Sequence, residues 1–437
     1  MTPAARLAAA IEVLQTIEDR HLPARMALKR WGEGARYAGS KDRAWVSGLA
    51  LDALRHRRSA PWMMGAEGPR AAALATLRFS WDWSAEQVAE AAAGEPHGPG
   101  VLSEEEAKAL AAPRVLDEAP APVRGDYPDW LDPYLARVFG EDRAAQGAAM
   151  ARRAPVDLRA NTLKGDAGRV LHALEPMGAA PSGVLRDALR IAAPQAAERA
   201  ASVESEPIFA KGWFEVQDLG SQIAAAAAGE IKGKQILDFC AGGGGKTLAL
   251  AAAMANSGQL YAYDSDAKRL SEVVTRGQRA GLRNLQVRSP SDPNAVGDLA
   301  ARIDLVFVDA PCTGLGTWRR HPDAKWRLTP AQLERRMAEQ DAVLDGASAC
   351  VKSGGRLVYV TCSLLAEENE DRIAAFLARA PAFAIRSALD AVAASGLAPP
   401  EGLEKLAACA TPEGFLRLSP LASDTDGFFV AVMERAS

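Results

Sequence analysis

The feature that most constrains the fold is an alternation of strands and helices from about residue 216 onward. Short apolar runs bounded by turn residues alternate there with helical segments, which is typical of a parallel sheet covered on both faces. The expected strands are residues 235–239, 259–263, 284–287, 305–308, 356–360 and 427–432. The pattern therefore predicts an α/β fold with a ligand crevice at the carboxyl ends of its strands.

Two cysteines follow two of these strands and lie about fifty residues apart. Cys312 stands in Asp309-Ala-Pro-Cys, and Cys362 stands in Tyr359-Val-Thr-Cys-Ser. Because the carboxyl ends of neighbouring parallel strands share one crevice, we expect both thiols to face one site. A thiolate there can attack an electrophilic ring carbon, and the second thiol then needs its own chemical role. The pair indicates covalent chemistry on a base.

A glycine-rich loop, Asp238-Phe-Cys-Ala-Gly-Gly-Gly-Gly-Lys-Thr, follows the first of these strands and opens a helix. Such glycines let the backbone approach a ligand closely, and the helix N-terminus offers free N–H groups. A Walker loop would need glycine at position 240, where this chain has Cys240, so the sequence argues against an ATPase.

Asp264 ends the next strand at the spacing where a carboxylate often binds ribose hydroxyls, although it could also cap the following helix. Loop and acid together fit a dinucleotide or S-adenosylmethionine. The Gly-x-Gly-x-x-Gly order is absent, which favours S-adenosylmethionine.

The length of 437 residues allows two or three domains. Residues 1–140 are predicted to be helical: Leu7, Ile11, Leu14 and Ile17 recur at helical spacing. In a further helix we expect Ser40 to be the N-cap and Trp45, Leu49 and Leu54 to point inward. Residues 95–128 are rich in proline, alanine and acid, which indicates a linker. Residues 150–215 mix short strands with helices, and residues 216–437 form the α/β domain.

The first twenty residues carry five charged side chains, so we expect no signal peptide, and no apolar stretch approaches a membrane span. Five cysteines fit neither a disulfide framework nor a zinc site, which indicates a cytoplasmic protein without a metal. The sequence does not determine the oligomeric state, and a monomer is the simplest expectation. Among the cysteines, Cys350 and Cys409 are interpreted as small buried side chains, and Cys240 as packing behind the loop.

A net charge of −4 hides an uneven distribution. Residues 1–61 hold eleven Lys and Arg against six Asp and Glu, whereas residues 62–150 hold seven against fifteen. The basic helix from Ser40 to Arg58 is therefore predicted to contact RNA through Arg55, Arg57 and Arg58.

Four motifs together closely resemble the Sun family of RNA cytosine-5 methyltransferases. They are the loop at 238–247, Asp-Ala-Pro-Cys-Thr-Gly-Leu-Gly at 309–316, Thr-Trp-Arg-Arg-His-Pro-Asp-Ala-Lys-Trp at 317–326, and Tyr-Val-Thr-Cys-Ser at 359–363. The resemblance covers residues 150–434, and the Arg-Arg-His-Pro-Asp run is similar to bacterial members that methylate small-subunit ribosomal RNA. These members carry an all-α domain similar to the antitermination factor NusB, which residues 1–140 are expected to form, ahead of a small α+β RNA-binding domain at 150–215 and a Rossmann-like catalytic domain at 216–437.

The resemblance implies a role for each motif residue. Cys362 would attack carbon 6 of cytosine, and Cys312 would assist release by helping to remove the carbon 5 proton. DNA cytosine methyltransferases use the Pro-Cys cysteine for attack, so the reverse assignment stays open. Asp309 would bind the flipped base, and Lys246 would act near the base or the nucleophile. The implied contacts to S-adenosylmethionine are Cys240, Ala241, Gly242, Gly243, Gly244, Gly245, Lys246, Asp264, Arg269, Asp292 and Asp309. The implied RNA contacts are Arg159, Arg319, Arg320, His321 and Lys325.

The chain departs from the family at two of these positions. Gly243 replaces a stiff proline, which adds freedom to the loop, and the segment that carries Asp292 matches poorly. Two rival functions stay open, namely transfer-RNA methylation with the same chemistry and a catalytically silent RNA-binding module. Intact Cys312, Cys362, Asp309 and Lys246 argue against the silent module.

Overall fold

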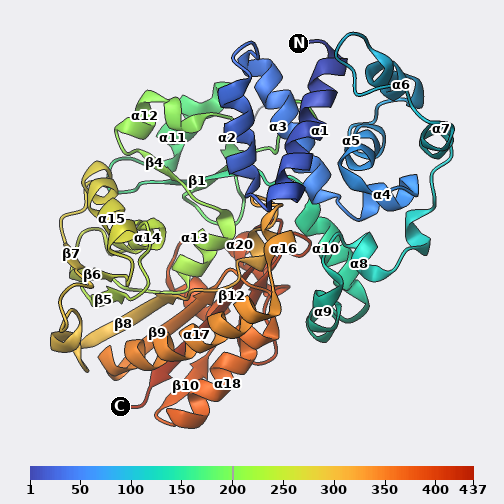
Figure 1. Cartoon of the computed structure of the whole chain (residues 1–437). Helices are drawn as coiled ribbons and strands as arrows, with labels where there is room; N and C mark the ends of the chain where they lie inside the picture. The colour runs from blue at the N-terminus through green and yellow to red at the C-terminus, as the bar shows by residue number, and fades with distance from the viewer. Residues whose placement is uncertain (199–200) are drawn as a thin grey trace. The chain divides into compact units, whose positions relative to one another are not determined.

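The computed structural model describes residues 1–198 and 201–437, and these form two compact units. The first unit contains residues 1–153, 193–198 and 318–327, and the second contains residues 154–192, 201–317 and 328–437. Figure 1 labels their helices and strands. No helix in the described ranges is long and apolar enough to cross a membrane.

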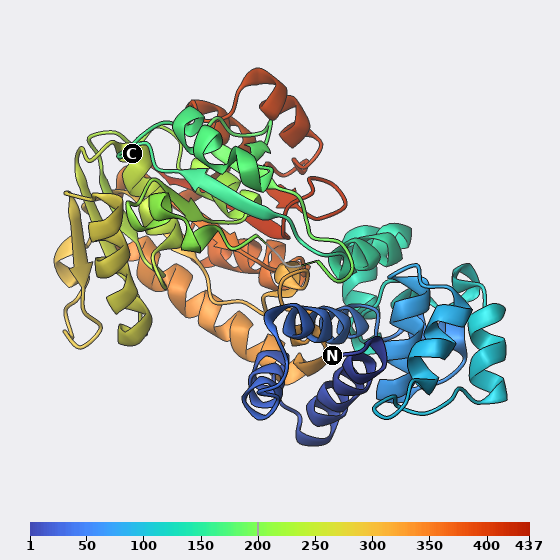
Figure 2. The same ribbon diagram turned by 90° about the horizontal axis from the view of Figure 1, so that it is seen from above.

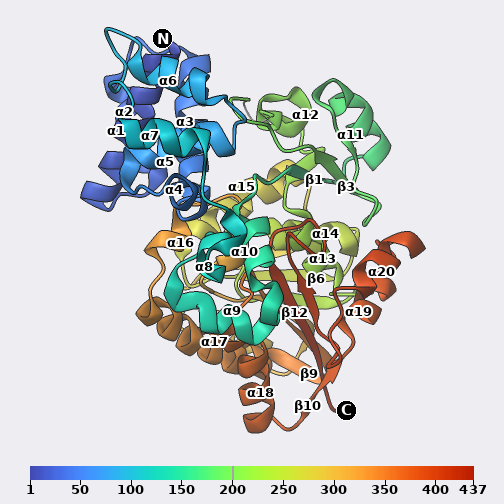
Figure 3. The ribbon, with the colours of Figure 1, turned by 90° about the vertical axis from the view of Figure 1, so that its right-hand side faces the viewer.

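The second unit is built on an eight-stranded sheet in the order β10-β12-β9-β8-β5-β6-β7, with β11 paired to β12. Its strands are β5 (Gln235–Asp238), β6 (Gln259–Tyr263), β7 (Leu285–Arg288), β8 (Ile303–Asp309), β9 (Val351–Thr361), β10 (Phe383–Arg386), β11 (Leu416–Leu418) and β12 (Phe428–Arg435). β5 to β9 pair in parallel, whereas β12 runs antiparallel to both β9 and β10 (Figure 3). The six predicted strands are confirmed to within a few residues at their ends.

Helices cover both faces of this sheet because successive strand residues point to opposite sides. In β8, Leu305 and Phe307 pack with one apolar cluster, while Val306 and Val308 pack with another. The first cluster includes α13 (Leu219–Ala226), α14 (Gly245–Met254), α19 (Ala388–Ala394) and α20 (Pro400–Ala407). The second includes α17 (Pro330–Cys350) and α18 (Glu370–Arg379). This arrangement confirms the predicted α/β class.

A smaller sheet, in the order β2-β3-β1-β4, belongs to the same unit. Its strands are β1 (Val156–Ala160), β2 (Ala180–Pro181), β3 (Ala188–Ile191) and β4 (Phe214–Val216), and all its pairings are antiparallel. The short helices α11 (Ala167–Leu174) and α12 (Pro207–Ala210) lie beside it in the chain. Leu158, Val170 and Phe214 form part of its own apolar core.

The first unit is helical, and its helices within residues 1–153 appear in blue to teal in Figure 2. They are α1 (Pro3–Arg20), α2 (Ala24–Gly34), α3 (Ser40–Arg55), α4 (Ser59–Met64), α5 (Gly68–Phe79), α6 (Ala85–Ala93), α7 (Glu104–Ala111), α8 (Ala121–Arg124), α9 (Asp132–Phe139) and α10 (Arg143–Ala151). Residues 318–327 add α16 (Ala324–Arg327) to the same unit. Leu7, Leu14, Trp45 and Leu49 are buried in one core, as their spacing predicted.

Two local predictions in this unit are wrong. The N-cap of α3 is Gly39 rather than Ser40, because the Asp42 side chain accepts a hydrogen bond from the Gly39 N–H at 3.1 Å. Residues 95–128 are not a bare linker, since they contain α7 and α8. Ser103 and Glu106 form a capping box that starts α7, which offsets the poor helix propensity of the surrounding prolines and glycines.

Candidate functional site

The two cysteines meet at the carboxyl ends of β8 and β9. These strands are parallel neighbours whose register pairs Asp309 with Val360, so the loops that follow them emerge side by side. Cys312 and Cys362 are both half-buried, and their Sγ atoms lie 3.3 Å apart. The structure thus brings together two thiols that are fifty residues apart in the sequence.

The thiol of Cys312 holds its proton tightly. The pKa of Cys312 is raised well above its usual range by the contact with the Cys362 sulfur, by burial, and by the nearby carboxylates of Glu368 and Asp309. Cys312 therefore keeps its proton near neutral pH, and its S–H can be directed at Cys362.

Lys246 lies in the first turn of α14, where the helix dipole disfavours a cation. Its Nζ donates to Asp309 Oδ2 at 2.7 Å and lies 5.1 Å from the centre of the Phe428 ring. Burial lowers the pKa of Lys246, but the charges of Asp309 and Cys362 outweigh burial and raise it. A protonated Lys246 can thus stabilise both Asp309 and a thiolate on Cys362.

The glycine loop joins β5 to α14 in a conformation that most side chains avoid. Gly242 has a φ of +53° and Gly244 a φ of +87°, both in the left-handed region. Ala241 N–H donates to the Tyr263 carbonyl at 2.9 Å, which holds the loop against the end of β6. The guanidinium of Arg269 lies across the loop, since a Cβ on Gly242 would come 2.5 Å from it.

Asp264 holds this loop rather than capping the next helix. Its Oδ2 accepts from the Gly242 N–H at 2.7 Å, and its Oδ1 accepts from the Asp266 N–H at 2.8 Å. The N-cap of α15 (Ala267–Ala280) is Asp266, whose side chain accepts from the N–H groups of Lys268 and Arg269. The alternative of Asp264 as a helix cap is therefore wrong.

The other predicted loop contacts occupy different environments. Cys240 is half-buried and burial raises the pKa of its thiol, so it packs as a neutral side chain, and Gly245 is the first residue of α14. Asp292 is exposed in the turn after β7, and its Oδ1 accepts from the Asn294 N–H at 2.9 Å.

One carboxylate beside the loop was missed by the sequence analysis. Asp238 ends β5 and is fully buried, and its Oδ2 accepts from Thr247 Oγ1 at 2.6 Å. Its Oδ1 has no hydrogen-bond partner among the described residues, and burial raises the pKa of Asp238 to about 7. A buried oxygen left open at the loop fits a ligand that brings its own donor. Its position at the strand end, just before the glycines, was the available signal.

Burial contradicts the prediction of RNA contact for Arg159. Its side chain lies on β1, only 7% of the residue is exposed, and Nε donates to Gln217 Oε1 at 2.8 Å. Burial lowers the pKa of its guanidinium to about 10. Arg159 therefore supports the small sheet from within.

Arg319 and Lys325 were also predicted to bind RNA phosphates, and both are buried, with exposed fractions of 2% and 1%. Lys325 Nζ donates to the Arg55 carbonyl at 2.8 Å, and burial lowers its pKa to about 7. The Lys325 side chain and the Arg319 carbonyl, which accepts from Arg55 Nη2 at 2.9 Å, fasten the segment 318–327 within the helical unit. Arg320 is half-buried and His321 is exposed, so their predicted contacts with RNA stay predictions.

The predicted RNA-binding arginines at the end of α3 are engaged within the protein. Arg55 is buried and pairs with Asp52 at 2.9 Å, Arg57 pairs with Glu18 at 2.9 Å, and Arg58 pairs with Asp129 at 2.9 Å. Each of these cations is already matched by a carboxylate. Burial argues against RNA contact by Arg55, whereas the predicted contacts of Arg57 and Arg58 stay predictions, because their side chains are 38% and 29% exposed.

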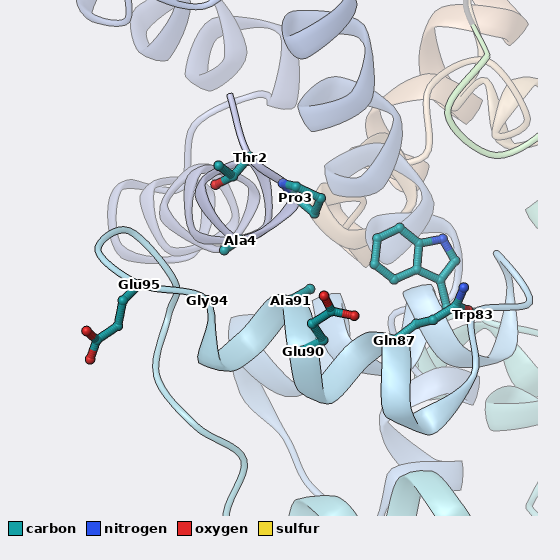
Figure 4. A pocket seen from close by; sticks show the side chains of 9 residues that line it. All are labelled: Thr2, Pro3, Ala4, Trp83, Gln87, Glu90, Ala91, Gly94 and Glu95. Carbon is teal, nitrogen blue, oxygen red and sulfur yellow. The ribbon is translucent and has the colours of Figure 1, made fainter.

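A hollow of the helical unit lies between α1 and α6 and is shown in Figure 4. Its charged lining residues, Glu90 and Glu95, are acidic, and Trp83 covers one side. Such a lining repels phosphate groups, so this hollow does not suit RNA. Within residues 1–198 and 201–437, no group of His, Cys, Asp and Glu side chains is arranged to hold a metal ion.

Comparison with known proteins identifies the family. Residues 228–434 match the family described as 16S rRNA methyltransferase RsmB/F. The chain is 31% identical over 319 residues to the probable ribosomal RNA small subunit methyltransferase B of Synechocystis, which covers 71% of this chain and 67% of that relative. It is 35% identical over 257 residues to the ribosomal RNA small subunit methyltransferase B of Citrobacter koseri, covering 58% of each chain.

A solved structure agrees with this assignment. The structure of a methyltransferase homolog protein from Pyrococcus horikoshii superposes with a TM-score of 0.58 at 26% identity, over 72% of this chain and 97% of that one. The curated matches span about two thirds or less of the relatives' own lengths. The comparisons confirm the predicted enzyme class, a methyltransferase that uses S-adenosylmethionine. The chain belongs to the RsmB/F family of 16S rRNA methyltransferases.

Proposed function

We propose that this chain transfers a methyl group from S-adenosylmethionine to carbon 5 of a cytosine in 16S ribosomal RNA through a covalent cysteine adduct. The observation that carries the proposal is the pair of thiols with Sγ atoms 3.3 Å apart, beside the Lys246–Asp309 ion pair. Carbon 5 of cytosine is a poor nucleophile. A sulfur that adds to carbon 6 turns it into an enamine carbon that can take a methyl group.

Cys362 is the proposed nucleophile. Its thiolate forms a bond to carbon 6, and the electron pair of the carbon 5–carbon 6 double bond moves toward nitrogen 3. Nitrogen 3 then takes up a proton, and we propose that Asp309 accepts from this N–H and from the exocyclic amine, since 34% of its side chain stays exposed although it pairs with Lys246. When bound, S-adenosylmethionine supplies the methyl group that carbon 5 takes up.

Cys312 is the proposed base for release. The largest cause of its raised pKa is the contact with Cys362, and that sulfur loses its charge when it bonds to carbon 6. Once Cys362 is bonded to carbon 6, this contact no longer holds the Cys312 proton, which passes to solvent water, and the resulting Cys312 thiolate then accepts the proton of carbon 5. The electrons left on carbon 5 restore the double bond and expel Cys362 as a thiolate. Attack by Cys362 on carbon 6 thus allows Cys312 to act as the base.

The loop residues fit the cofactor. Gly242, Gly244 and Asp264 shape a backbone cradle at the start of α14, and the open Oδ1 of Asp238 can accept from a donor such as an ammonium group. Arg269 and Asp292 are proposed as further contacts at the rim. The proposal would place Asp238 among the cofactor-binding residues.

The direct test is a methylation assay on the full chain. Unmethylated 16S rRNA and transfer RNA would each be incubated with S-adenosylmethionine carrying a labelled methyl group, then digested to nucleosides for mass spectrometry. We expect labelled 5-methylcytidine from the 16S rRNA. Label in transfer RNA alone would reassign the substrate, and label on another base or atom would overturn the proposed chemistry.

Replacing Gly243 with proline, the residue of the family, should stabilise the loop. Unlike its neighbours Gly242 and Gly244, Gly243 does not have a positive φ. A Cβ there would meet only the ends of two flexible side chains, Glu272 at 3.0 Å and Arg276 at 3.7 Å. We expect Gly243→Pro to add about 0.4–1 kcal/mol by restricting the unfolded chain, and to tighten cofactor binding. Thermal unfolding with and without S-adenosylmethionine measures both effects.

The matched control is Gly244→Pro. The φ of +87° at Gly244 is incompatible with a proline ring, so this variant should lose stability. If both prolines destabilised the protein equally, the loop conformation described here would be wrong.

We also propose that the helical unit binds RNA through α2 and the loop after it. Residues 20–41 carry six cations and one acidic residue. The cations are Arg20, Arg25, Lys29, Arg30, Arg36 and Lys41, and all are exposed. Tyr37 is 74% exposed beside them, and an exposed ring among cations is the arrangement on which RNA bases stack. The positive charge of residues 1–61 is thus available on α2, not at the end of α3.

Replacing Arg25, Arg30 and Arg36 with alanine should flatten the salt dependence of RNA affinity. Each lost phosphate contact lowers the slope of log K against log salt concentration by about 0.7–0.9. Fluorescence titrations at several salt concentrations measure the slope. The control replaces Arg57 and Arg58, which are ion-paired, and should leave the slope unchanged. If the salt slope changed only in the control variant, the end of α3 rather than α2 would be the part that contacts RNA.

A further inference from the structure

Two consecutive residues, Glu368 and Asn369, hydrogen-bond to the chain next to the two cysteines. They follow β9, at the end of a short 3-10 helix (Ala366–Glu368) and just before α18, and both are 0% exposed. The Tyr359 hydroxyl donates to the Glu368 carbonyl at 2.7 Å, which ties this position to β9. Neither residue was singled out from the sequence.

Glu368 holds the loop of Cys312. Its Oε1 accepts from the Thr313 N–H at 2.8 Å, and its Oε2 accepts from Thr313 Oγ1 at 2.5 Å. Oε1 also accepts from Gln340 Nε2 at 3.0 Å, and the same amide donates to the Pro311 carbonyl at 2.9 Å. The residues before and after Cys312 are therefore both connected to this carboxylate.

Asn369 holds the loop of Cys362 in the same way. Its Oδ1 accepts from Thr361 Oγ1 at 2.5 Å, and its Nδ2 donates to the Ser363 carbonyl at 3.0 Å. Thr361 and Ser363 are the two neighbours of Cys362. Because residues 368 and 369 are joined by one peptide bond, the two cysteine loops are connected through adjacent side chains.

A fully buried carboxylate is costly unless several donors satisfy it. Glu368 accepts from an amide N–H, a hydroxyl and a side-chain amide, all of them neutral, so a neutral acceptor could have filled part of this role. The charge does have a consequence at the site, since Glu368 is among the groups that help Cys312 to keep its proton. Geometry and charge at Cys312 therefore depend on one residue.

We propose that Glu368 and Asn369 are positioning residues that set the separation of the two reactive sulfurs. The proposal rests on the proposed function, because a fixed separation has value only if both thiols act on one base. Without these contacts, two hydrogen bonds would join the loops at the cysteines. They run from the Gly316 N–H to the Cys362 carbonyl at 2.9 Å and from Thr313 Oγ1 to Ser363 Oγ at 3.4 Å. The sulfur atoms would then sample a wider range of distances.

Disulfide trapping tests this without any RNA. The azo compound diamide takes two electrons and two protons from a thiol pair, so that an S–S bond forms and the N=N bond is reduced to a hydrazine. In the full chain with native residues at both cysteines, the rate of this oxidation reports how often the sulfurs meet. Mass spectrometry of the peptides that carry Cys312 and Cys362 follows the product.

The two test variants are nearly isosteric with the native residues. One alters the contacts to the Cys312 loop and the other alters the contacts to the Cys362 loop. Glu368→Gln removes the charge and one acceptor, and Thr361→Val removes the hydroxyl that donates to Asn369. We expect each to slow disulfide formation at least tenfold, and to lower kcat for methylation while KM for RNA stays unchanged. The control Asp304→Asn alters a carboxylate at the opposite end of β8, which accepts from the Gln235 N–H at 2.8 Å, and should leave the trapping rate unchanged.

The two readouts separate this inference from the proposed function. Trapping at the native rate in either folded variant would overturn the positioning role, whatever the enzymatic activity. Slow trapping in the variants would support it even if the native chain failed to methylate cytosine, a result that would contradict only the proposed reaction. Because either variant alone decides the question, loss of one through misfolding leaves the other informative.

Discussion

Replacing Cys362 with alanine should reduce methylation roughly a thousandfold or more, as the loss of a covalent nucleophile does in other enzymes. Without the sulfur no bond to carbon 6 forms, and carbon 5 stays too electron-poor to take the methyl group. Cofactor binding should persist, because the loop at 239–245 and Asp264 are unchanged. Isothermal titration with S-adenosylmethionine, run beside the labelled assay, separates the two effects.

Replacing Cys312 with alanine should give a different defect. Attack by Cys362 and methyl transfer still proceed, but the carbon 5 proton is not removed, so the bond between Cys362 and carbon 6 does not break. We expect a protein–RNA adduct that survives denaturing electrophoresis. Cys350→Ala is the control, because Cys350 is a buried cysteine in α17 that should form no adduct and keep native activity. An adduct from the Cys362 variant instead would reverse the two assignments.

The part of the fold that was predicted correctly depends on local patterns. Strands buried on both faces have near-continuous apolar sequences, so the run around Val306 identified β8 without knowledge of its neighbours. The meeting of Cys312 and Cys362 followed from the rule that parallel strands end at one edge. The family resemblance added the roles of these residues, and the match at 228–434 confirms the family itself.

The errors concern charges whose environment depends on distant parts of the chain. Arg55 is buried because its guanidinium donates to the Arg319 carbonyl at 2.9 Å, a contact between residues 264 positions apart. Lys325 lies against the same helix for a similar reason. In a sequence, a basic cluster that will be buried resembles one that will bind phosphate. Glu368 was overlooked for the converse reason, since an acidic run such as Glu367-Glu-Asn-Glu370 is usually exposed.

Asp52 holds the arginine at the end of α3 inside the protein, and its replacement is expected to destabilise the helical unit strongly. It is 5% exposed, and its Oδ2 accepts from Arg153 Nη2 at 2.6 Å and from Trp81 Nε1 at 2.8 Å, while Oδ1 accepts from Arg55 Nη1 at 2.9 Å. Replacing it with asparagine would leave two guanidinium groups without their shared charge. Breaking a buried ion pair in this way typically costs about 3–5 kcal/mol.

In the full chain, the amide hydrogens of α3 and α5 should therefore exchange far faster in the Asp52→Asn variant than in the native protein. Native-state hydrogen exchange measures this difference. The control is Asp117→Asn, which alters an exposed carboxylate of the same unit and should change little. Unchanged exchange in the Asp52 variant would mean that Arg55 and Arg153 are satisfied without it, and would return Arg55 to the candidates for RNA contact.

The pH dependence gives a second check on the same residue. Burial raises the pKa of Asp52, but the hydrogen bond from Arg153 and the charges of Arg55 and Arg153 outweigh burial, so the folded pKa lies below the unfolded value. A carboxylate whose pKa is lower in the folded protein than in the unfolded chain stabilises the folded state. This stabilisation is complete above the pKa in the unfolded chain, about 3.9, and is lost as the pH falls through the pKa in the folded protein. The stability gap between the native chain and Asp52→Asn should therefore be constant from neutral pH down to about 5 and shrink in more acidic solution. A gap that grew on acidification would show that Asp52 is protonated in the folded protein, and that the arginines around it are held by other groups.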